Sequence, residues 1–133
     1  VQTCALPICR RESRWRAASA YPSRPGRSTA SLRTELRALL GTECWEDVLW
    51  QVREIKARDG LSEGFLASCR RQAHLGNLRH YRSDSERFSM YLTQIPHAEC
   101  DADLLDAADA MLSRMTADSW TAKAREFIDA QKR

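Results

Sequence analysis

The sequence predicts an all-α fold, a small single-domain bundle of five or six short helices. Three observations support this prediction. From residue 31 onward, apolar residues recur at the three- and four-residue spacing of a helix face, with no alternating strand pattern. Residues suited to cap helices precede several of these segments, and Gly or Pro often follows them. The chain has 133 residues, 43% of them hydrophobic, which suffices for one modest core.

The first three helices are predicted between residues 31 and 77. The first helix follows Ser31 and ends at Gly41. The second begins near Thr42 and ends at the Asp59–Gly60 pair. Ser62 is suited to cap a third helix, which Gly76–Asn77 closes. The apolar faces of these helices comprise, in turn, Leu32, Leu36, Leu39 and Leu40; Trp45, Val48, Leu49, Val52 and Ile55; and Phe65, Leu66, Cys69 and Ala73.

Three further helices are predicted in the remainder of the chain. Ser83-Asp84-Ser85-Glu86 has the spacing of a capping box for the fourth helix, and Pro96 stops it. Asp101 opens the fifth helix, and Asp118 or Ser119 begins the sixth. Their apolar faces comprise, in turn, Phe88, Tyr91, Leu92 and Ile95; Leu104, Ala108, Met111, Leu112 and Met115; and Trp120, Ala124, Phe127 and Ile128.

Residues 1–30 differ from the rest of the chain. Read back into DNA, Val1–Ile8 resemble a common sequencing-library adapter, so we expect them to be an assembly artefact. The following residues up to 30 are rich in Arg, Ser, Ala, Pro and Gly, a composition typical of a disordered leader or of translated non-coding DNA. We therefore expect a helical bundle domain at 31–133. It is either a fragment of a larger bacterial protein, which we favour, or free-standing.

Charge and cysteine content exclude several classes of protein. Six arginines and one glutamate lie within residues 1–30, whereas residues 31–133 carry 15 basic and 17 acidic side chains. Because residues 31–133 are slightly acidic, we do not expect a nucleic-acid-binding protein whose folded surface is basic throughout. No stretch has the length and apolarity of a membrane span. With residues 1–8 left out, the cysteines are Cys9, Cys44, Cys69 and Cys100, and their spacing gives neither a CxxC pair nor a disulfide framework. This pattern favours a reducing, cytoplasmic location.

Histidines and cysteines raise the question of a metal site. His97-Ala98-Glu99 resembles the zinc-binding HAE of nucleobase deaminases, but the PCxxC that completes their metal shell is absent from the chain. A zinc site built from Cys69, His74, His97 and Cys100 would lack the close-spaced ligand pairs typical of structural zinc. We therefore predict no metal, no cofactor and no catalytic residue.

Trp50 is the side chain most suggestive of a partner contact. On an ideal helix it lies about 140° from Trp45, opposite the apolar face and among charged residues that include Arg53. A tryptophan on a charged helix face often marks an interface. The alternative interpretation is that another helix of the same chain covers it.

Arginines concentrate between residues 70 and 87. Guanidinium groups beside aromatic rings can bind phosphates and stack on bases, which suggests a nucleic-acid contact. A solvated helix face is the alternative interpretation. The residues of this segment that enter either interpretation are Arg70, Arg71, Arg79, His80, Tyr81, Arg82 and Arg87.

Two family resemblances cover about 40 residues, up to Tyr81. The segment 46–52 resembles the second metal-binding helix of MazG-like nucleotide pyrophosphohydrolases, which implies that Asp47, with Glu43 or Glu46, holds magnesium. The ExxD of that family is broken here by Cys44, and no ExxE precedes it, so the resemblance implies a degenerate or truncated copy. The same span is similar to helical adaptor domains of bacterial conflict systems in its elements Asp47–Val48, Gly60, Phe65–Leu66, Gly76–Asn77 and Leu78.

The leading hypothesis is a non-catalytic helical interaction module that contacts a protein partner or a second copy of itself. The candidate contact residues are Trp50, Arg53, Arg70, Arg71, Arg79 and Arg82. One alternative is a degenerate or truncated MazG-like pyrophosphohydrolase, with Glu43, Glu46 and Asp47 as magnesium ligands. The other is a small nucleic-acid-binding domain that uses Arg70, Arg71, Arg79 and Arg82.

Overall fold

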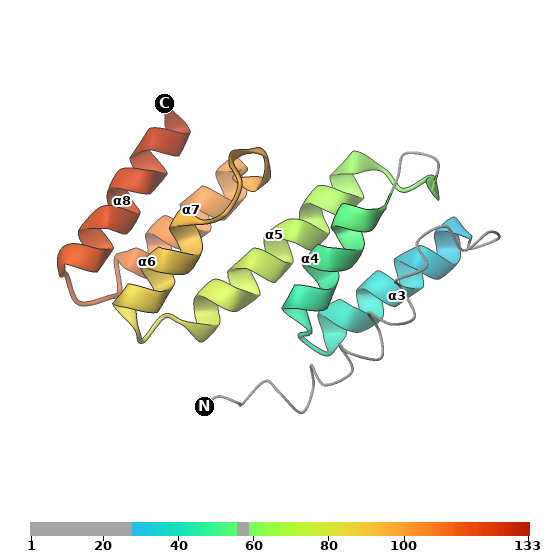
Figure 1. The fold of residues 1–133 in the computed structure, drawn as a ribbon, viewed down its shortest axis with the longest axis horizontal. Coiled ribbons are helices and arrows are strands. Elements are labelled where there is room, and N and C mark those ends of the chain that lie inside the picture. Colours follow the sequence, from blue (N-terminus) through green and yellow to red (C-terminus); the bar gives the residue numbers. More distant parts are fainter. Residues whose placement is uncertain (1–27, 56–58) are drawn as a thin grey trace. The chain divides into compact units, whose positions relative to one another are not determined.

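The computed structural model describes residues 28–55 and 59–133, in which helices are joined by short loops and no strand occurs (Figure 1). The all-α prediction is therefore confirmed for this part of the chain, whereas Val1–Ile8 and nearly all of the arginine-rich leader lie outside it. The helices are α3 (Thr29–Gly41), α4 (Trp45–Glu54), α5 (Glu63–His80), α6 (Ser85–Thr93), the 3₁₀ helix η2 (His97–Glu99), α7 (Ala102–Leu112) and α8 (Ser119–Lys132).

The chain divides into two compact units, and the boundary falls inside α5, between Ala73 and His74. Each unit has an apolar core of its own. None of the helices in the described ranges is both long and apolar enough to cross a membrane.

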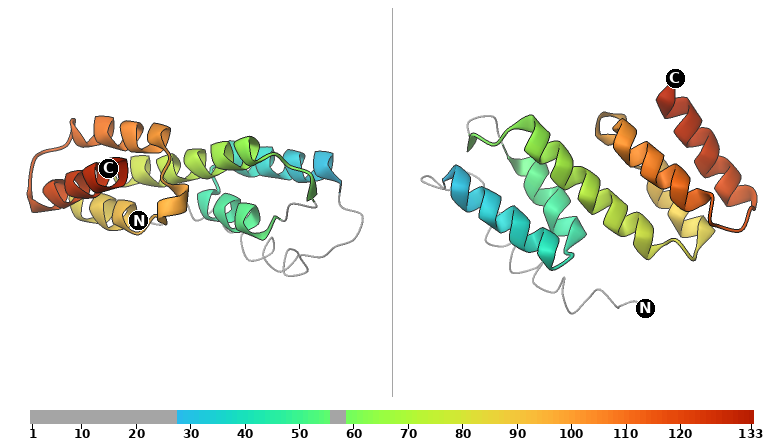
Figure 2. Two further views of the ribbon diagram at one scale, coloured as in Figure 1. Left: turned by 90° about the horizontal axis from the view of Figure 1, so that it is seen from above. Right: turned by 180° about the vertical axis from the view of Figure 1, so that it is seen from behind.

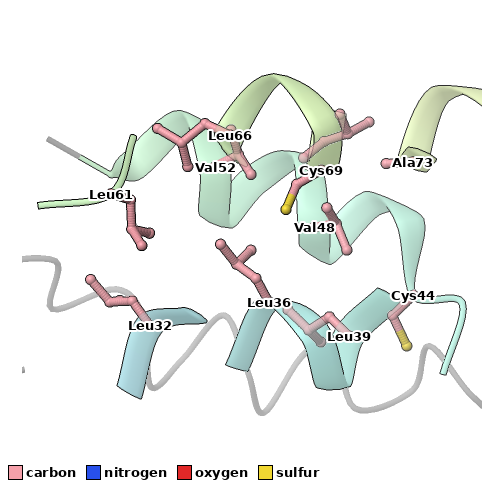
Figure 3. Close-up of a cluster of buried hydrophobic side chains, with 11 residues drawn as sticks. Leu32, Leu36, Leu39, Cys44, Val48, Val52, Leu61, Leu66, Cys69 and Ala73 are labelled. Carbon is pink, nitrogen blue, oxygen red and sulfur yellow. The ribbon is translucent and has the colours of Figure 1, made fainter. Parts of the chain in front are cut away.

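The first unit is built around α3 and α4, which pack against each other, with the N-terminal part of α5 completing the core. In Figure 3, Leu32 of α3 and Leu61, which lies just before α5, point toward each other. Burial of these side chains is what holds the short helices, since an isolated helix of this length is only marginally stable in water. The buried residues are Leu32, Leu36, Leu39, Cys44, Val48, Leu49, Val52, Leu61, Leu66, Cys69 and Ala73.

Three boundaries of α3, α4 and α5 differ from those predicted. The helix predicted to end at Asp59–Gly60 already ends at Glu54, because Ile55 takes an extended backbone conformation. The helix predicted to close at Gly76–Asn77 continues to His80. A glycine within a helix costs only about 1 kcal/mol relative to alanine, and the burial of flanking residues outweighs that cost. Helix α3 begins at Thr29, two residues before the predicted start of the helical domain.

The Asp59–Gly60 pair ends the connection into α5 and is tied to the start of α3. The hydroxyl of Thr29 donates a hydrogen bond to the carbonyl oxygen of Asp59 at 2.7 Å. Gly60 has a φ of +81°, in the left-handed region that favours glycine. A Cβ added to Gly60 would lie 2.6 Å from Oγ1 of Thr29, so the turn has no room for a side chain.

In the second unit, α8 packs against both α6 and α7 (Figure 2). Across the α7–α8 contact, Asp106 accepts from Lys132 at 2.8 Å and Asp109 from Arg125 at 2.6 Å. These exposed pairs contribute little stability, so the apolar core carries most of it. Its buried residues are Leu78, Phe88, Leu92, Ile95, Leu104, Leu105, Ala108, Leu112, Ala124 and Ile128.

Side-chain caps begin each α-helix of the second unit after α5. Asp101 Oδ1 accepts from the backbone N–H of Leu104 at 2.8 Å, as predicted. The cap of α6 is Asp84, not the predicted Ser83 at the head of the box, because the carboxylate of Asp84 accepts from the backbone N–H of Arg87. Ser62 likewise caps α5 as predicted, accepting from the backbone N–H of Phe65 at 3.1 Å.

Asp118 is the cap with the most partners. Its carboxylate accepts from the hydroxyl of Ser85 and from the backbone N–H groups of Thr121 and Trp120, and the Thr121 hydroxyl completes a capping box. The hydrogen bond from Ser85 is the largest of the effects that lower the pKa of Asp118 below its ordinary value of 3.8. The charged carboxylate thus joins the N-terminal ends of α6 and α8.

We expect Gly60→Ala to destabilise the first unit by about 2 kcal/mol, because alanine adds left-handed strain and a contact with Thr29. Gly64→Ala is the matched control, since nothing lies within 4 Å of its added Cβ and alanine favours the helix. Chemical denaturation of both variants measures the difference. Equal stability of the two variants would show that the turn at Gly60 is not constrained.

We expect part of the acid sensitivity of the second unit to arise from Asp118. Because its pKa is lowered in the folded state, the stabilisation is present above its ordinary value and is lost as the pH falls below about 4. Asp118→Asn keeps a capping side chain but does not titrate, so its melting temperature should fall less steeply in acid. Asp129→Asn, which removes an exposed carboxylate from the same helix, should retain the wild-type pH profile. Identical profiles for all three proteins would contradict this assignment.

Candidate functional site

Trp50 lies on α4 and is half-buried. The side chains that are partly buried and pack against the described core of the first unit include Trp45 but not Trp50. One helical turn to either side of Trp50, Glu46 and Arg53 are exposed. Trp50 is therefore not part of the core that the described residues form, although it is less exposed than an outward-facing residue would be.

The predicted arginines belong to different units. Arg70 and Arg71 are half-buried in the first unit, and Arg70 Nη2 pairs with Glu63 Oε2 at 2.5 Å. Arg79 and Arg82 are exposed in the second unit, where the backbone N–H of Arg82 donates to the carbonyl oxygen of Arg79. Arg79 therefore lies in the last turn of α5, and Arg82 lies in the turn that follows it.

The carboxylates expected from the MazG-like resemblance differ in their surroundings. Glu43 and Glu46 are exposed, and Glu43 has a φ of +59° in the loop before α4. Asp47 is only 1% exposed, within the first turn of α4. Within residues 28–55 and 59–133, no three His, Cys, Asp or Glu side chains are placed to hold a metal ion. Glu43, Glu46 and Asp47 therefore do not form a metal-binding group.

The side chains considered as zinc ligands are engaged elsewhere. His97 Nδ1 lies 2.5 Å from Oε1 of Gln131, and the Cys100 thiol donates to the carbonyl oxygen of Ile95. Cys69 is buried in the core of the first unit, and burial raises the pKa of its thiol. Burial, together with the neighbouring Glu99, also raises the pKa of Cys100. Burial thus favours the protonated form of both thiols.

A buried polar cluster in the second unit was not predicted. We name it the His74 cluster; it consists of His74, Asn77, Tyr91 and Glu99. His74 is 2% exposed, with Nδ1 2.7 Å from the Tyr91 hydroxyl and Nε2 2.8 Å from Glu99 Oε1. Asn77 Nδ2 donates to the same hydroxyl at 2.8 Å. The cluster therefore ties η2 and α6 to the end of α5.

The donors and acceptors of the His74 cluster agree with one arrangement of protons. Asn77 donates to the Tyr91 oxygen, so the Tyr91 hydroxyl can donate its own proton to Nδ1 of His74. The Nε2–H of His74 then donates to the Glu99 carboxylate. A carboxylate that orients an imidazole beside a hydroxyl has the connectivity of a catalytic relay. In this chain these hydrogen bonds are partly buried and join α5, α6 and η2, so we expect their loss to reduce stability.

Sequence patterns held only a weak signal for this cluster. His74 and Asn77 are three residues apart, so they share one face of α5, and Tyr91 lies on the predicted apolar face of α6. Glu99 lies 25 residues after His74, and no local rule pairs the two. The HAE segment was instead considered for its resemblance to a zinc motif.

Comparison of the chain with protein-family models, with curated proteins and with solved structures found no match. The two family resemblances seen in the sequence therefore stay predictions. Any assignment of function has to come from the side chains themselves.

We expect Tyr91→Phe to destabilise the second unit by about 1–2 kcal/mol, because it leaves His74 and Asn77 without their shared partner. Tyr81→Phe is the matched control. The Tyr81 ring lies 6.1 Å from that of Tyr91, and Tyr81 is half-buried too, so its substitution should change stability by less than about 0.5 kcal/mol. Thermal unfolding followed by circular dichroism compares them. A harmless Tyr91→Phe would contradict the structural role of the cluster.

Proposed function

We propose that this chain is a helical protein-interaction module, which acts by contact with a partner protein or a second copy rather than by catalysis. The observation that carries the proposal is the position of Trp50, half-buried and outside the described core of the first unit, with exposed charged residues one turn away. Tryptophan is among the residues that contribute most to interface energies. A large ring surrounded by polar side chains suits the centre of a contact surface.

The two alternatives draw on other observations. Nucleic-acid binding is supported by the exposed Arg79 and Arg82 on either side of Tyr81, whose ring contacts that of His80 at 5.2 Å. It is the second candidate, because the slight acidic excess of residues 31–133 works against it. A MazG-like hydrolase is the weaker alternative, because magnesium requires converging carboxylates and Asp47 is buried.

We expect Trp50→Ala to leave the fold intact, changing the free energy of unfolding by less than about 1 kcal/mol, while weakening association at least about tenfold. Trp45→Ala is the matched control on the same helix. Trp45 packs against the core, so its removal should cost about 2 kcal/mol or more. Circular dichroism measures the stability of both variants. Sedimentation velocity measures self-association, and affinity capture with mass spectrometry compares recovered partners.

Two results would contradict the proposal. If Trp50→Ala unfolds the protein as Trp45→Ala does, Trp50 is a core residue and the argument from its position fails. If the wild-type chain neither self-associates nor recovers a protein that Trp50→Ala loses, then Trp50 does not serve an interface.

A further inference from the structure

A second surface of the first unit combines an aromatic ring of α5 with two arginines of α3. Phe65, near the start of α5, is half-buried and packs against the core. From α3, the guanidinium carbons of Arg33 and Arg37 lie 5.3 and 5.7 Å from the centre of its ring. We name these three residues the Phe65 surface.

The two arginines of α3 are one helical turn apart and carry like charges. Within the described ranges, neither Arg33 nor Arg37 pairs with a carboxylate. The contacts of their guanidinium groups are the cation–π contacts with the ring of Phe65. A cation–π contact uses the charge of the guanidinium group and leaves its N–H donors available. Arg70 differs, because Glu63 already pairs with it. The uncompensated charge of the surface is therefore that of Arg33 and Arg37.

The charges of this surface also act on the core beneath it. Burial raises the pKa of the Cys69 thiol, while the positive charges of Arg37 and Arg70 act in the opposite direction. The ring of Phe65 supplies an apolar contact beside Arg33 and Arg37.

We propose that the Phe65 surface binds an acidic segment of a partner protein. Carboxylates accept paired hydrogen bonds from guanidinium groups, and an apolar side chain of the same segment can pack on the ring. The proposal rests on the proposed function, since it names a partner class for an interaction module. It concerns residues other than Trp50, so the two can fail independently.

Charge complementarity selects this occupant over others. The chain's own leader, with six arginines and one glutamate in residues 1–30, would be repelled. In a second copy, Asp106 and Asp109 of α7 are already paired with Lys132 and Arg125. Carboxylates match the paired N–H donors of guanidinium groups, so a separate protein segment that presents carboxylates is the occupant we propose. Nucleic acid is also an anion, and the comparison with single-stranded DNA below distinguishes the two.

The test measures fluorescence anisotropy of a labelled peptide of repeated Asp-Glu-Leu units, titrated with the full chain. The same peptide with Asn and Gln in place of the acids is the probe control. We expect Arg33→Gln combined with Arg37→Gln to weaken binding of the acidic peptide roughly tenfold. Arg79→Gln combined with Arg82→Gln removes the same charge from the second unit and should change binding less than about twofold. Binding should weaken as salt rises.

Phe65→Leu separates the ring from the charges. It keeps an apolar side chain against the core but removes the surface on which the guanidinium groups lie, so we expect roughly threefold weaker binding. Circular dichroism confirms that each variant is folded.

Four results would overturn the inference. The wild-type chain could fail to bind the acidic peptide, or could bind the Asn/Gln peptide equally well. The two double variants could lose the same affinity, which would indicate net charge rather than this surface. Single-stranded DNA of matched charge could bind more tightly through Arg33 and Arg37, which would indicate nucleic acid instead. If association through Trp50 persists in any of these cases, this inference fails and the proposed function stands.

Discussion

Burial of apolar side chains along α5 is the constraint on which the rest of the structure depends. Leu66 and Cys69 belong to the core of the first unit, and Leu78 belongs to the core of the second. The other α-helices have 9 to 14 residues, lengths at which a helix alone is marginal in water. Each unit therefore needs its own stretch of α5, and the need to bury both stretches explains why the helix continues through Gly76.

Polar groups determine where the helices of the second unit begin and how its core is locked. The caps Asp84, Asp101 and Asp118 satisfy backbone N–H groups that a helix start would leave without partners. In the interior, His74 and Glu99 satisfy each other. Since a buried polar group without a hydrogen bond is costly, this pairing favours a single arrangement of η2 against α5.

The surface of the first unit offers two kinds of contact. Trp50 presents a large ring among exposed charges, whereas Phe65 holds two arginines whose charge no carboxylate in the described ranges compensates. Interfaces favour this combination, because aromatic rings supply buried area and arginine supplies directional hydrogen bonds. Both features accord with an interaction module, and neither requires a catalytic centre.

The sequence by itself determined the helical class, the apolar faces and several caps, including Ser62, Asp101 and Asp118. These features depend on residues within four positions of one another, so periodicity and capping patterns reveal them. Tertiary structure alone decided that α5 runs past Gly76–Asn77, that His74 meets Glu99, and that Arg33 and Arg37 lie over Phe65. Those outcomes depend on contacts between residues 25 or more positions apart, or on burial that outweighs local propensity, and no local pattern encodes either.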